Sequence, residues 1–351
     1  MTFEEFIMQA REMNASDIHL TVGAPTVVRV NGELRKYTEL SDQVVNRTIL
    51  SILSAEQEKM LTEGKDIDFS FELKNGARQR VNVFRQSGKL AACIRLLNAE
   101  IPTLEELKMP PVLLEFAKKR RGLVLVTGPT GAGKSTTLAA LMEYINKTRA
   151  CHVITIEDPI EYRYKQEKAT IHQRELGRDV PSFHEALRSA LREDPDVILI
   201  GEMRDYETIS LAMTAAETGH LVFGTLHTSS AAQTIDRIID ACPVHSQEQV
   251  RSQLASMIQG IIAQTLIPRA DGKGRVAAVE VMIGTDAIRN LIRSAKINMM
   301  ETTMAAGSRD GMCTLNTSLA NLYKTGQISY ETALEYATDR GEMEKKLLSG
   351  I

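Results

Sequence analysis

The residues with the clearest capacity for chemistry form one short loop. Positions 128–136 fit the pattern G-x-x-x-x-G-K-[ST], and they are Gly128, Pro129, Thr130, Gly131, Ala132, Gly133, Lys134, Ser135 and Thr136. Glycines allow successive backbone amides to point at anionic oxygens, and a helix that begins here adds its positive end. Lys134 can reach the β- and γ-phosphates of a nucleotide, and the Ser135 hydroxyl can bind Mg²⁺. Because an apolar run precedes the loop and a helical pattern follows it, the segment predicts a nucleoside-triphosphate site.

Two further apolar runs end in carboxylates. Residues 197–200 lead to Gly201 and Glu202, and residues 154–156 lead to Glu157. A metal-binding aspartate commonly stands at the position of Gly201, so that aspartate is missing here. We expect Glu202 to polarise an attacking water, and Glu157 to supply the missing oxygen ligand to Mg²⁺, directly or through water. The structural alternatives are a solvated strand end for Glu202 and a turn or helix cap for Glu157.

A histidine and two arginines complete the candidate set. His227 follows the apolar run 221–226, so we expect it at the same sheet edge as Glu202. There it could donate a hydrogen bond to a γ-phosphate, or it could have a structural role at the edge of the core, with its hydrogen bonds made within the protein. Arg80 and Arg95 lie on expected strands of the first part of the chain. In phosphoryl transfer, an arginine often supplied by a neighbouring subunit stabilises the charge of the transition state. The alternation of buried and exposed side chains along a half-buried strand explains exposed arginines equally well.

These residues divide between two differently patterned parts. Residues 1–97 combine helical spacing with strand-like runs, and the turns Asn31-Gly32 and Asn75-Gly76 predict hairpins, so we expect an α+β domain with an antiparallel sheet. Three prolines within 98–111 predict a linker. Residues 112–351 alternate short apolar runs with amphipathic helices, which is typical of an α/β domain with a parallel sheet covered on both faces. Past residue 250 we expect a long helix, a strand at 276–283 and then mostly helices.

Composition restricts the class of protein. The chain has 351 residues and a formal net charge of −3, with 43% hydrophobic and 25% charged residues, which is typical of a globular protein. No apolar run reaches the ~20 residues of a membrane-spanning helix, and the acidic N-terminus does not fit a signal peptide. We therefore expect a soluble cytoplasmic protein that is not an integral membrane protein. The four cysteines lack C-x-x-C spacing, which argues against a zinc site.

Several ordered motifs together resemble one family. They are N-A-S-D-I-H-L at 14–20, V-R-V-N-G-E at 28–33, R-V-N-V-F-R-Q-S-G at 80–88, the loop at 128–136, I-T-I-E-D-P-I-E at 154–161, L-I-G-E-M-R-D at 199–205, T-G-H-L-V-F-G-T-L-H-T at 218–228 and A-I-R-N-L-I-R at 287–293. The chain resembles the type IV pilus retraction (twitching motility) ATPases of the type II/IV secretion ATPase superfamily over essentially its whole length. The family usually continues the last motif with glutamate, where this chain has Ser294. From the residues alone, Arg289 and Arg293 beside an apolar helical face suggest a carboxylate partner.

The resemblance implies a fold and a site. It implies a PAS-like N-terminal domain, a RecA-like ATPase domain and a homohexamer that uses ATP and Mg²⁺. It assigns the catalytic carboxylate to Glu202, assistance at the metal and water to Glu157, and sensing of the γ-phosphate to His227. Arg80 and Arg95 match the arginines that reach the nucleotide from the N-terminal domain.

The resemblance also implies a setting. The partners would be an inner-membrane pilus platform protein and an accessory retraction paralogue, with the ring at the inner face of the cytoplasmic membrane. Pilin disassembly would then support twitching motility, adhesion or DNA uptake. The alternatives are a pilus extension or type II secretion assembly ATPase, which usually carries an extra N-terminal domain and a four-cysteine zinc insert, and a nucleic-acid translocase. The absence of tryptophan, the small number of tyrosines and phenylalanines, and the lack of a dense basic run other than Lys118–Arg121 disfavour direct nucleic-acid binding.

Overall fold

The structure is a computed structural model that describes residues 3–30, 32–97 and 100–348. Asn31 of the first predicted turn and positions 98 and 99 of the predicted linker lie outside these ranges. The chain separates into two compact units. The first is Met1–Glu100 with Glu161–Arg163, and the second is Ile101–Ile160 with Tyr164–Ile351.

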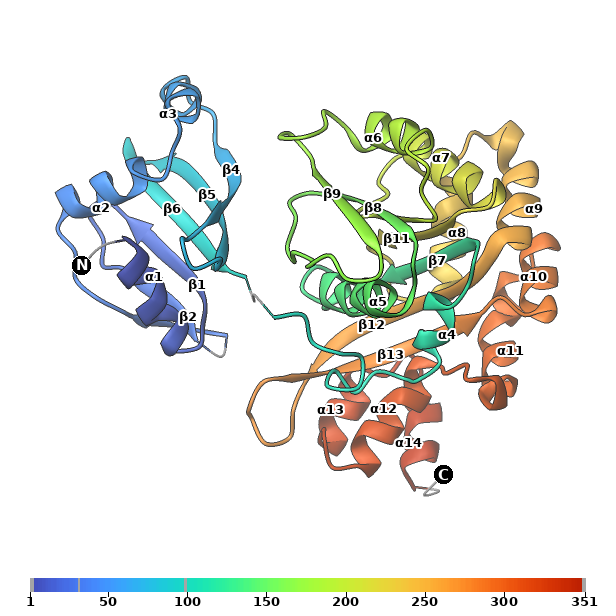
Figure 1. The fold of residues 1–351 in the computed structure, drawn as a ribbon. Coiled ribbons are helices and arrows are strands. Elements are labelled where there is room, and N and C mark those ends of the chain that lie inside the picture. Colours follow the sequence, from blue (N-terminus) through green and yellow to red (C-terminus); the bar gives the residue numbers. More distant parts are fainter. Residues whose placement is uncertain (1–2, 31, 98–99, 349–351) are drawn as a thin grey trace. The chain divides into compact units, whose positions relative to one another are not determined.

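The N-terminal unit is built on a six-stranded sheet in the order β3-β2-β1-β6-β5-β4, in which all neighbours are antiparallel (Figure 1). The strands are β1 (Ala15–Thr21), β2 (Val27–Val30), β3 (Glu33–Lys36), β4 (Ile67–Glu72), β5 (Arg78–Gln86) and β6 (Lys89–Leu96). The helices are α1 (Phe3–Glu12), α2 (Asp42–Leu50) and α3 (Ala55–Thr62). Alternate residues such as Ile18, Val81 and Ile94 are fully buried in one cluster with Ile7 of α1 and Ile49 of α2. One face of the sheet is therefore covered by helices, as the alternation predicts.

The second unit is built on a seven-stranded sheet in the order β13-β12-β7-β11-β10-β8-β9. The strands are β7 (Gly122–Thr127), β8 (His152–Glu157), β9 (Thr170–Glu175), β10 (Val197–Ile200), β11 (Leu221–Leu226), β12 (Ile258–Pro268) and β13 (Arg275–Ile283). All neighbouring strands are parallel except β12 and β13. The helices are α4 (Leu113–Ala117), α5 (Lys134–Thr148), α6 (Phe183–Ala190), α7 (Tyr206–Glu217), α8 (Ala231–Asp240), α9 (Gln247–Met257), α10 (Asp286–Arg293), α11 (Met300–Ala306), α12 (Leu315–Lys324), α13 (Tyr330–Glu335) and α14 (Arg340–Leu348).

Both faces of this sheet are buried. On β7, Leu123 and Leu125 belong to one core cluster, with α6 to α10, whereas Val124 and Val126 belong to another, with α4 and α5. A strand that is buried on both faces has no polar face, which explains why the central strands are continuous apolar runs in the sequence.

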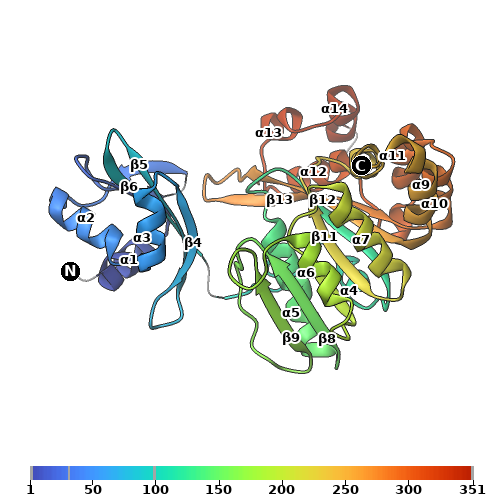
Figure 2. The ribbon, with the colours of Figure 1, turned by 90° about the horizontal axis from the view of Figure 1, so that it is seen from above.

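The prediction of a long helix past residue 250 was wrong. Helix α9 ends at Met257, and the next residues form β12, which pairs in parallel with β7 and antiparallel with β13. Helices α12 to α14 pack on the far ends of β12 and β13 (Figure 2). The guanidinium of Arg289 on α10 donates to the carbonyls of Gly284 and Ile258 at 2.8 and 3.1 Å, and a carboxylate partner for Arg289 and Arg293 stays a prediction. Among the described residues, no helix is both long and apolar enough to cross a bilayer.

Candidate active site

The phosphate loop connects β7, which ends at Thr127, to α5, which begins at Lys134. Gly128, Gly131 and Gly133 have φ values of +143°, +79° and +87°, a region that L side chains rarely adopt. The ammonium of Lys134 donates to the carbonyls of Gly128 and Pro129 at 2.7 and 3.0 Å. The lysine therefore lies over its own loop, at the N-terminal end of α5, where helix and amide dipoles favour an anion.

Strand β12 forms a wall beside this loop. A Cβ at Gly128 would lie 2.2 Å from the backbone oxygen of Gln264, and a Cβ at Gly133 would lie 3.0 Å from its Nε2. Gln264 also contacts the loop through hydrogen bonds of its own side chain. Our sequence analysis missed Gln264 because it assigned this segment to a helix. The available signal was the isoleucine-rich composition of 258–267, which favours a strand and is interrupted by the polar residues Gln259, Gln264 and Thr265.

The two strand-end carboxylates come from adjacent parallel strands, since Ile156 of β8 pairs with Ile200 of β10. A Cβ at Gly201 would lie only 3.0 Å from the oxygen of Ile156 and 3.2 Å from the Cα of Glu157. The crowding gives a physical reason for glycine where an aspartate is usual. The carboxylate of Glu157 is half-buried and accepts from Thr155 Oγ1 at 2.6 Å and from Gln173 Nε2 at 3.1 Å.

Glu202 and His227 meet at the carboxyl edge of the sheet. The Oε1 of Glu202 lies 2.9 Å from His227 Nε2, and its Oε2 lies 2.6 Å from Arg204 Nη2. Burial acts to raise the pKa of Glu202, but the hydrogen bonds and charges of Arg204 and His227 outweigh it and lower that pKa. The next helices start at capped positions just beyond, where the side chains of Asp205 and Ser230 accept from backbone amides. These caps fix the short segments that carry Glu202 and His227.

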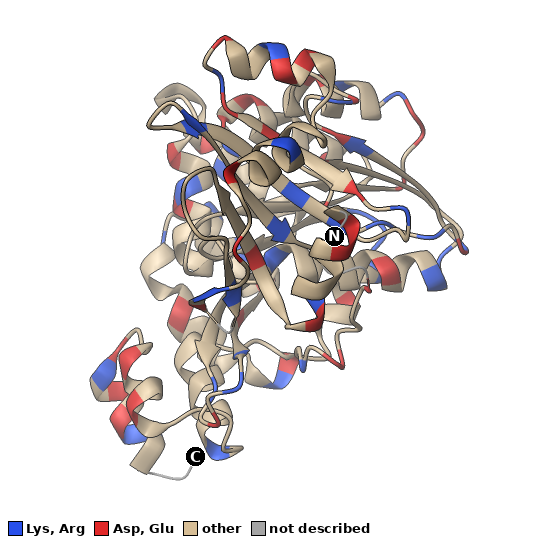
Figure 3. Ribbon diagram, turned by 90° about the vertical axis from the view of Figure 1, so that its left-hand side faces the viewer, with Lys and Arg blue, Asp and Glu red and all other residues tan. Residues whose placement is uncertain are grey.

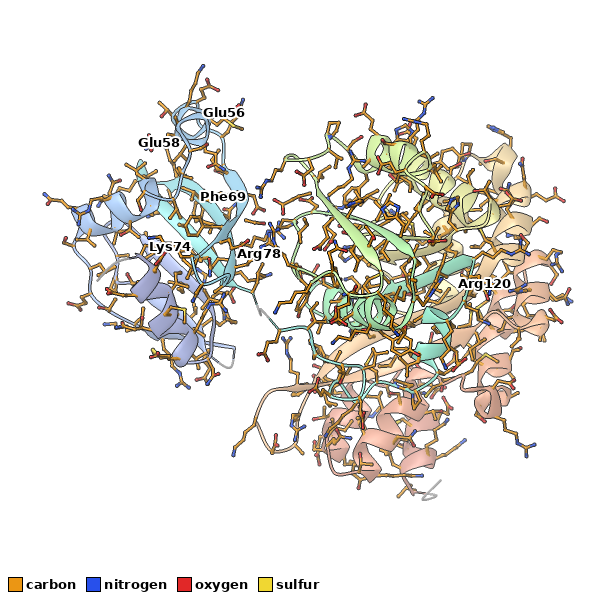
Figure 4. The ribbon with its side chains drawn as sticks, in the orientation of Figure 1. Glu56, Glu58, Phe69, Lys74, Arg78 and Arg120 are labelled. Atoms are coloured by element: carbon orange, nitrogen blue, oxygen red, sulfur yellow. The ribbon has the colours of Figure 1, made fainter. Side chains whose placement is uncertain are left out.

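The two predicted arginines lie in the N-terminal unit. Arg80 on β5 and Arg95 on β6 are directly opposite each other in the antiparallel register. Each guanidinium is paired with an aspartate of the flanking strand, Arg80 Nη2 with Asp68 Oδ2 at 2.6 Å and Arg95 Nε with Asp17 Oδ1 at 3.0 Å. Figure 4 labels Phe69, the neighbour of Asp68 on β4. The aspartates offset the repulsion between two like charges on one face of the sheet.

A glycine-rich loop between a parallel strand and a helix, with a glutamate at the end of another strand of the same sheet, defines a P-loop ATPase. The family model described as type II/IV secretion system protein matches residues 1–343, and the chain belongs to this family.

Similar proteins support this assignment over nearly the whole chain. The chain is 50% identical to a type IV pilus retraction ATPase, PilT, of Pseudomonas aeruginosa, over 96% of this chain and 98% of that protein. It is 48% identical to a twitching motility protein of Neisseria gonorrhoeae, over 90% of this chain and 85% of that one. A crystal structure of the pilus retraction motor PilT with bound ADP superposes with a TM-score of 0.91 and 48% identity, covering 98% of this chain and 99% of that one. The predicted fold class is confirmed as an N-terminal α+β domain followed by a RecA-like ATPase domain, and the chain is a nucleotide-binding ATPase.

Proposed function

We propose that the chain is an ATP-hydrolysing motor that powers retraction of type IV pili. The observation that carries this proposal is the 50% identity to a pilus retraction ATPase over 96% of the chain. The phosphate loop and Glu202, which are the parts that an ATP hydrolase needs, support the same proposal. Pilin disassembly by such a motor supports twitching motility, adhesion or DNA uptake.

The loop residues 128–136 bind the phosphates of ATP. Lys134 is positioned to exchange its two carbonyl partners for phosphate oxygens. Mg²⁺ keeps several waters and takes phosphate oxygens as ligands, so few protein ligands suffice. The oxygens of Ser135 and Glu157 fit this requirement, and the described residues contain no group of three or more carboxylate, thiol or imidazole ligands that would suit another metal better. When bound, Mg²⁺ neutralises charge on the phosphates.

Hydrolysis depends on Glu202. Its carboxylate orients the attacking water and accepts its proton, and its low pKa keeps it ionised at neutral pH. His227, which contacts Glu202 at 2.9 Å, senses the γ-phosphate. A hydrogen bond from His227 to the γ-phosphate would replace its bond to Glu202. The contact with phosphate would then mark the ATP-bound state, and the contact with Glu202 a state without a γ-phosphate.

Arg80 and Arg95 act in trans within a homohexamer, on the nucleotide of a neighbouring subunit. An arginine at the transferring phosphoryl group offsets the charge of the transition state. Asp68 and Asp17 orient the two guanidinium groups while leaving much of each exposed, with side-chain exposures of 36% for Arg80 and 60% for Arg95. Exposed charged groups of this kind are available to a second chain.

The ring acts at the inner face of the cytoplasmic membrane, on a pilus platform protein, together with an accessory retraction paralogue. In the view of Figure 3, basic and acidic residues are interspersed along the ribbon. Interspersed charge suits protein partners better than the continuous basic groove of a translocase. We therefore expect no direct contact with nucleic acid.

Deletion of the gene tests the proposal. Cells that lack a retraction motor should carry more surface pili and lose twitching, whereas cells that lack an extension motor should carry none. A gene copy with Glu202→Gln should leave the deletion phenotype uncorrected. A copy with Glu248→Gln, an exposed acidic residue at the start of α9, should correct it. A bald deletion strain, or purified protein that releases phosphate only when DNA is added, would contradict the proposal.

A further inference from the structure

We propose that Gln264 is a positioning residue that holds the phosphate loop in its nucleotide-binding shape and thereby sets the affinity for nucleotide. This inference rests on the proposed binding of nucleotide by the loop. Gln264 is 3% exposed and lies on β12, a strand that contributes no residue to the phosphate-loop motif.

The sheet register brings Gln264 to the loop. The parallel ladder between β7 and β12 ends with the pair Thr127 and Ala263. The chain of β7 then turns away into the loop, while β12 continues for five more residues, through Pro268. Gln264 is the first residue past the end of the ladder, so it faces the loop at the point where the backbone leaves the sheet.

One amide group joins two parts of the loop. Gln264 Nε2 donates to the carbonyl of Ala132, inside the loop, at 2.5 Å. Its Oε1 accepts from the hydroxyl of Thr137, on the first turn of α5, at 2.9 Å. Because a carbonyl can only accept, the contact with Ala132 fixes which end of the amide carries the nitrogen. Only an amide supplies a donor and an acceptor in this arrangement.

The backbone of the same residue limits the loop from the side. A Cβ at Gly128 would clash with the carbonyl oxygen of Gln264 at 2.2 Å, and a Cβ at Gly133 would make a tight contact of 3.0 Å with its Nε2. Glycines give the loop the freedom to curl, and that freedom is also a conformational entropy that binding must overcome. A buried brace that selects one shape before nucleotide arrives reduces this cost, which is the general effect of preorganisation on affinity.

Substitution by methionine removes the brace with little change in volume. In Gln264→Met, the Ala132 carbonyl and the Thr137 hydroxyl lose their partner. We expect the Kd for ADP, measured by calorimetry on the full chain with Mg²⁺, to rise about tenfold, which corresponds to about 1.4 kcal/mol. Hydrogen exchange without nucleotide should become faster at the backbone amides of 128–137.

Gln259→Met is the matched control. Gln259 lies on the same strand and donates to a backbone carbonyl, that of Arg121 at 3.1 Å, but it lies at the opposite end of β12. We expect it to leave both the Kd for ADP and the exchange of the loop unchanged. A residue with only a structural role would lower the melting temperature without changing the Kd, so unchanged ADP binding by a folded Gln264→Met protein would overturn the proposal.

A second variant keeps the test decisive if Gln264→Met does not fold. Thr137→Val preserves the branched shape and deletes only the hydroxyl that anchors the amide, so the Kd should rise about threefold and the loop should exchange faster. Unchanged values for both quantities would refute the brace. Failure of the unsubstituted chain to bind ADP would instead refute the proposed function, and the exchange comparison would still show whether Gln264 orders the loop.

Discussion

Alanine at Gly128 should destabilise the ATPase domain more than alanine at Gly131, although both glycines belong to the same loop. Both have positive φ, so each alanine carries backbone strain, and the strain is greater at Gly128, whose φ of +143° lies farther from the left-handed helical region than the +79° of Gly131. The two sites differ in space. A Cβ at Gly128 would lie 2.2 Å from the backbone oxygen of Gln264, whereas a Cβ at Gly131 would have no neighbour within 4 Å.

The clash sets the magnitude of the difference. The oxygen of Gln264 belongs to β12, which is hydrogen-bonded between β7 and β13, so it cannot move aside cheaply. Overpacking of this kind costs about 1–3 kcal/mol. For a domain of this size, 1 kcal/mol lowers the melting temperature by about 2–4 °C. Gly128→Ala should therefore melt about 2–12 °C below Gly131→Ala.

Scanning calorimetry without nucleotide measures this difference, and Gly131→Ala is the matched variant, because it has positive φ without the crowding. A second readout is the Kd for ADP, which should rise in Gly128→Ala because the loop can no longer keep its shape beside β12. Equal melting temperatures for the two variants would refute the argument, since the crowding at Gly128 would then have no energetic consequence.

Three further predictions concern carboxylates. Glu202→Gln should lower phosphate release about 10²–10⁴-fold while ADP binding is retained, and turnover within twofold of the unsubstituted chain would contradict its role as a base. Arg204→Ala removes a cation that lowers the pKa of Glu202, so the acid limb of the pH–rate profile should move to higher pH; an unmoved limb would exclude the coupling. Burial raises the pKa of Glu280 above its ordinary 4.5, because the folded protein favours the neutral carboxyl. The contribution of Glu280 to the free energy of unfolding is therefore largest below pH 4.5 and declines as the pH rises. Melting temperatures of Glu280→Gln should therefore depend less on pH above about 4.5, and identical slopes would contradict the assignment.

Local patterns predicted the parts of the site that are determined within one strand–turn–helix segment. The loop from Gly128 to Thr136 is one such segment, since its glycines, lysine and flanks are all contiguous. Parallel strands bring their carboxyl ends to one edge, so the sequence also predicted that Glu202 and His227 would share an edge, and the structure places them 2.9 Å apart. The roles of these residues in hydrolysis remain proposals.

Features that depend on distant pairing escaped the sequence analysis. The run 258–267 is mostly apolar, and a short run of this kind does not by itself distinguish a buried helix from a buried strand. Its position between β7 and β13 decides the outcome, and Gln264 acquires its contacts only through that position. The bonds of Arg289 depend on the same strand, because one of the two carbonyls to which it donates belongs to Ile258, at the start of β12.

The surroundings of Glu202 bear on how hydrolysis must proceed. A carboxylate whose pKa is lowered by two partners is a weaker proton acceptor than a free one, so these contacts oppose the role of general base that we propose for Glu202. The opposition is removed if a partner leaves before the water is deprotonated. The side chain of Arg204 is 71% exposed, whereas that of Glu202 is 18% exposed, so water can solvate the guanidinium when it departs. His227 has a competing acceptor once a γ-phosphate is in place. With the roles that we propose, nucleotide binding would convert Glu202 from a restrained carboxylate to an active base, and His227 would couple the two events.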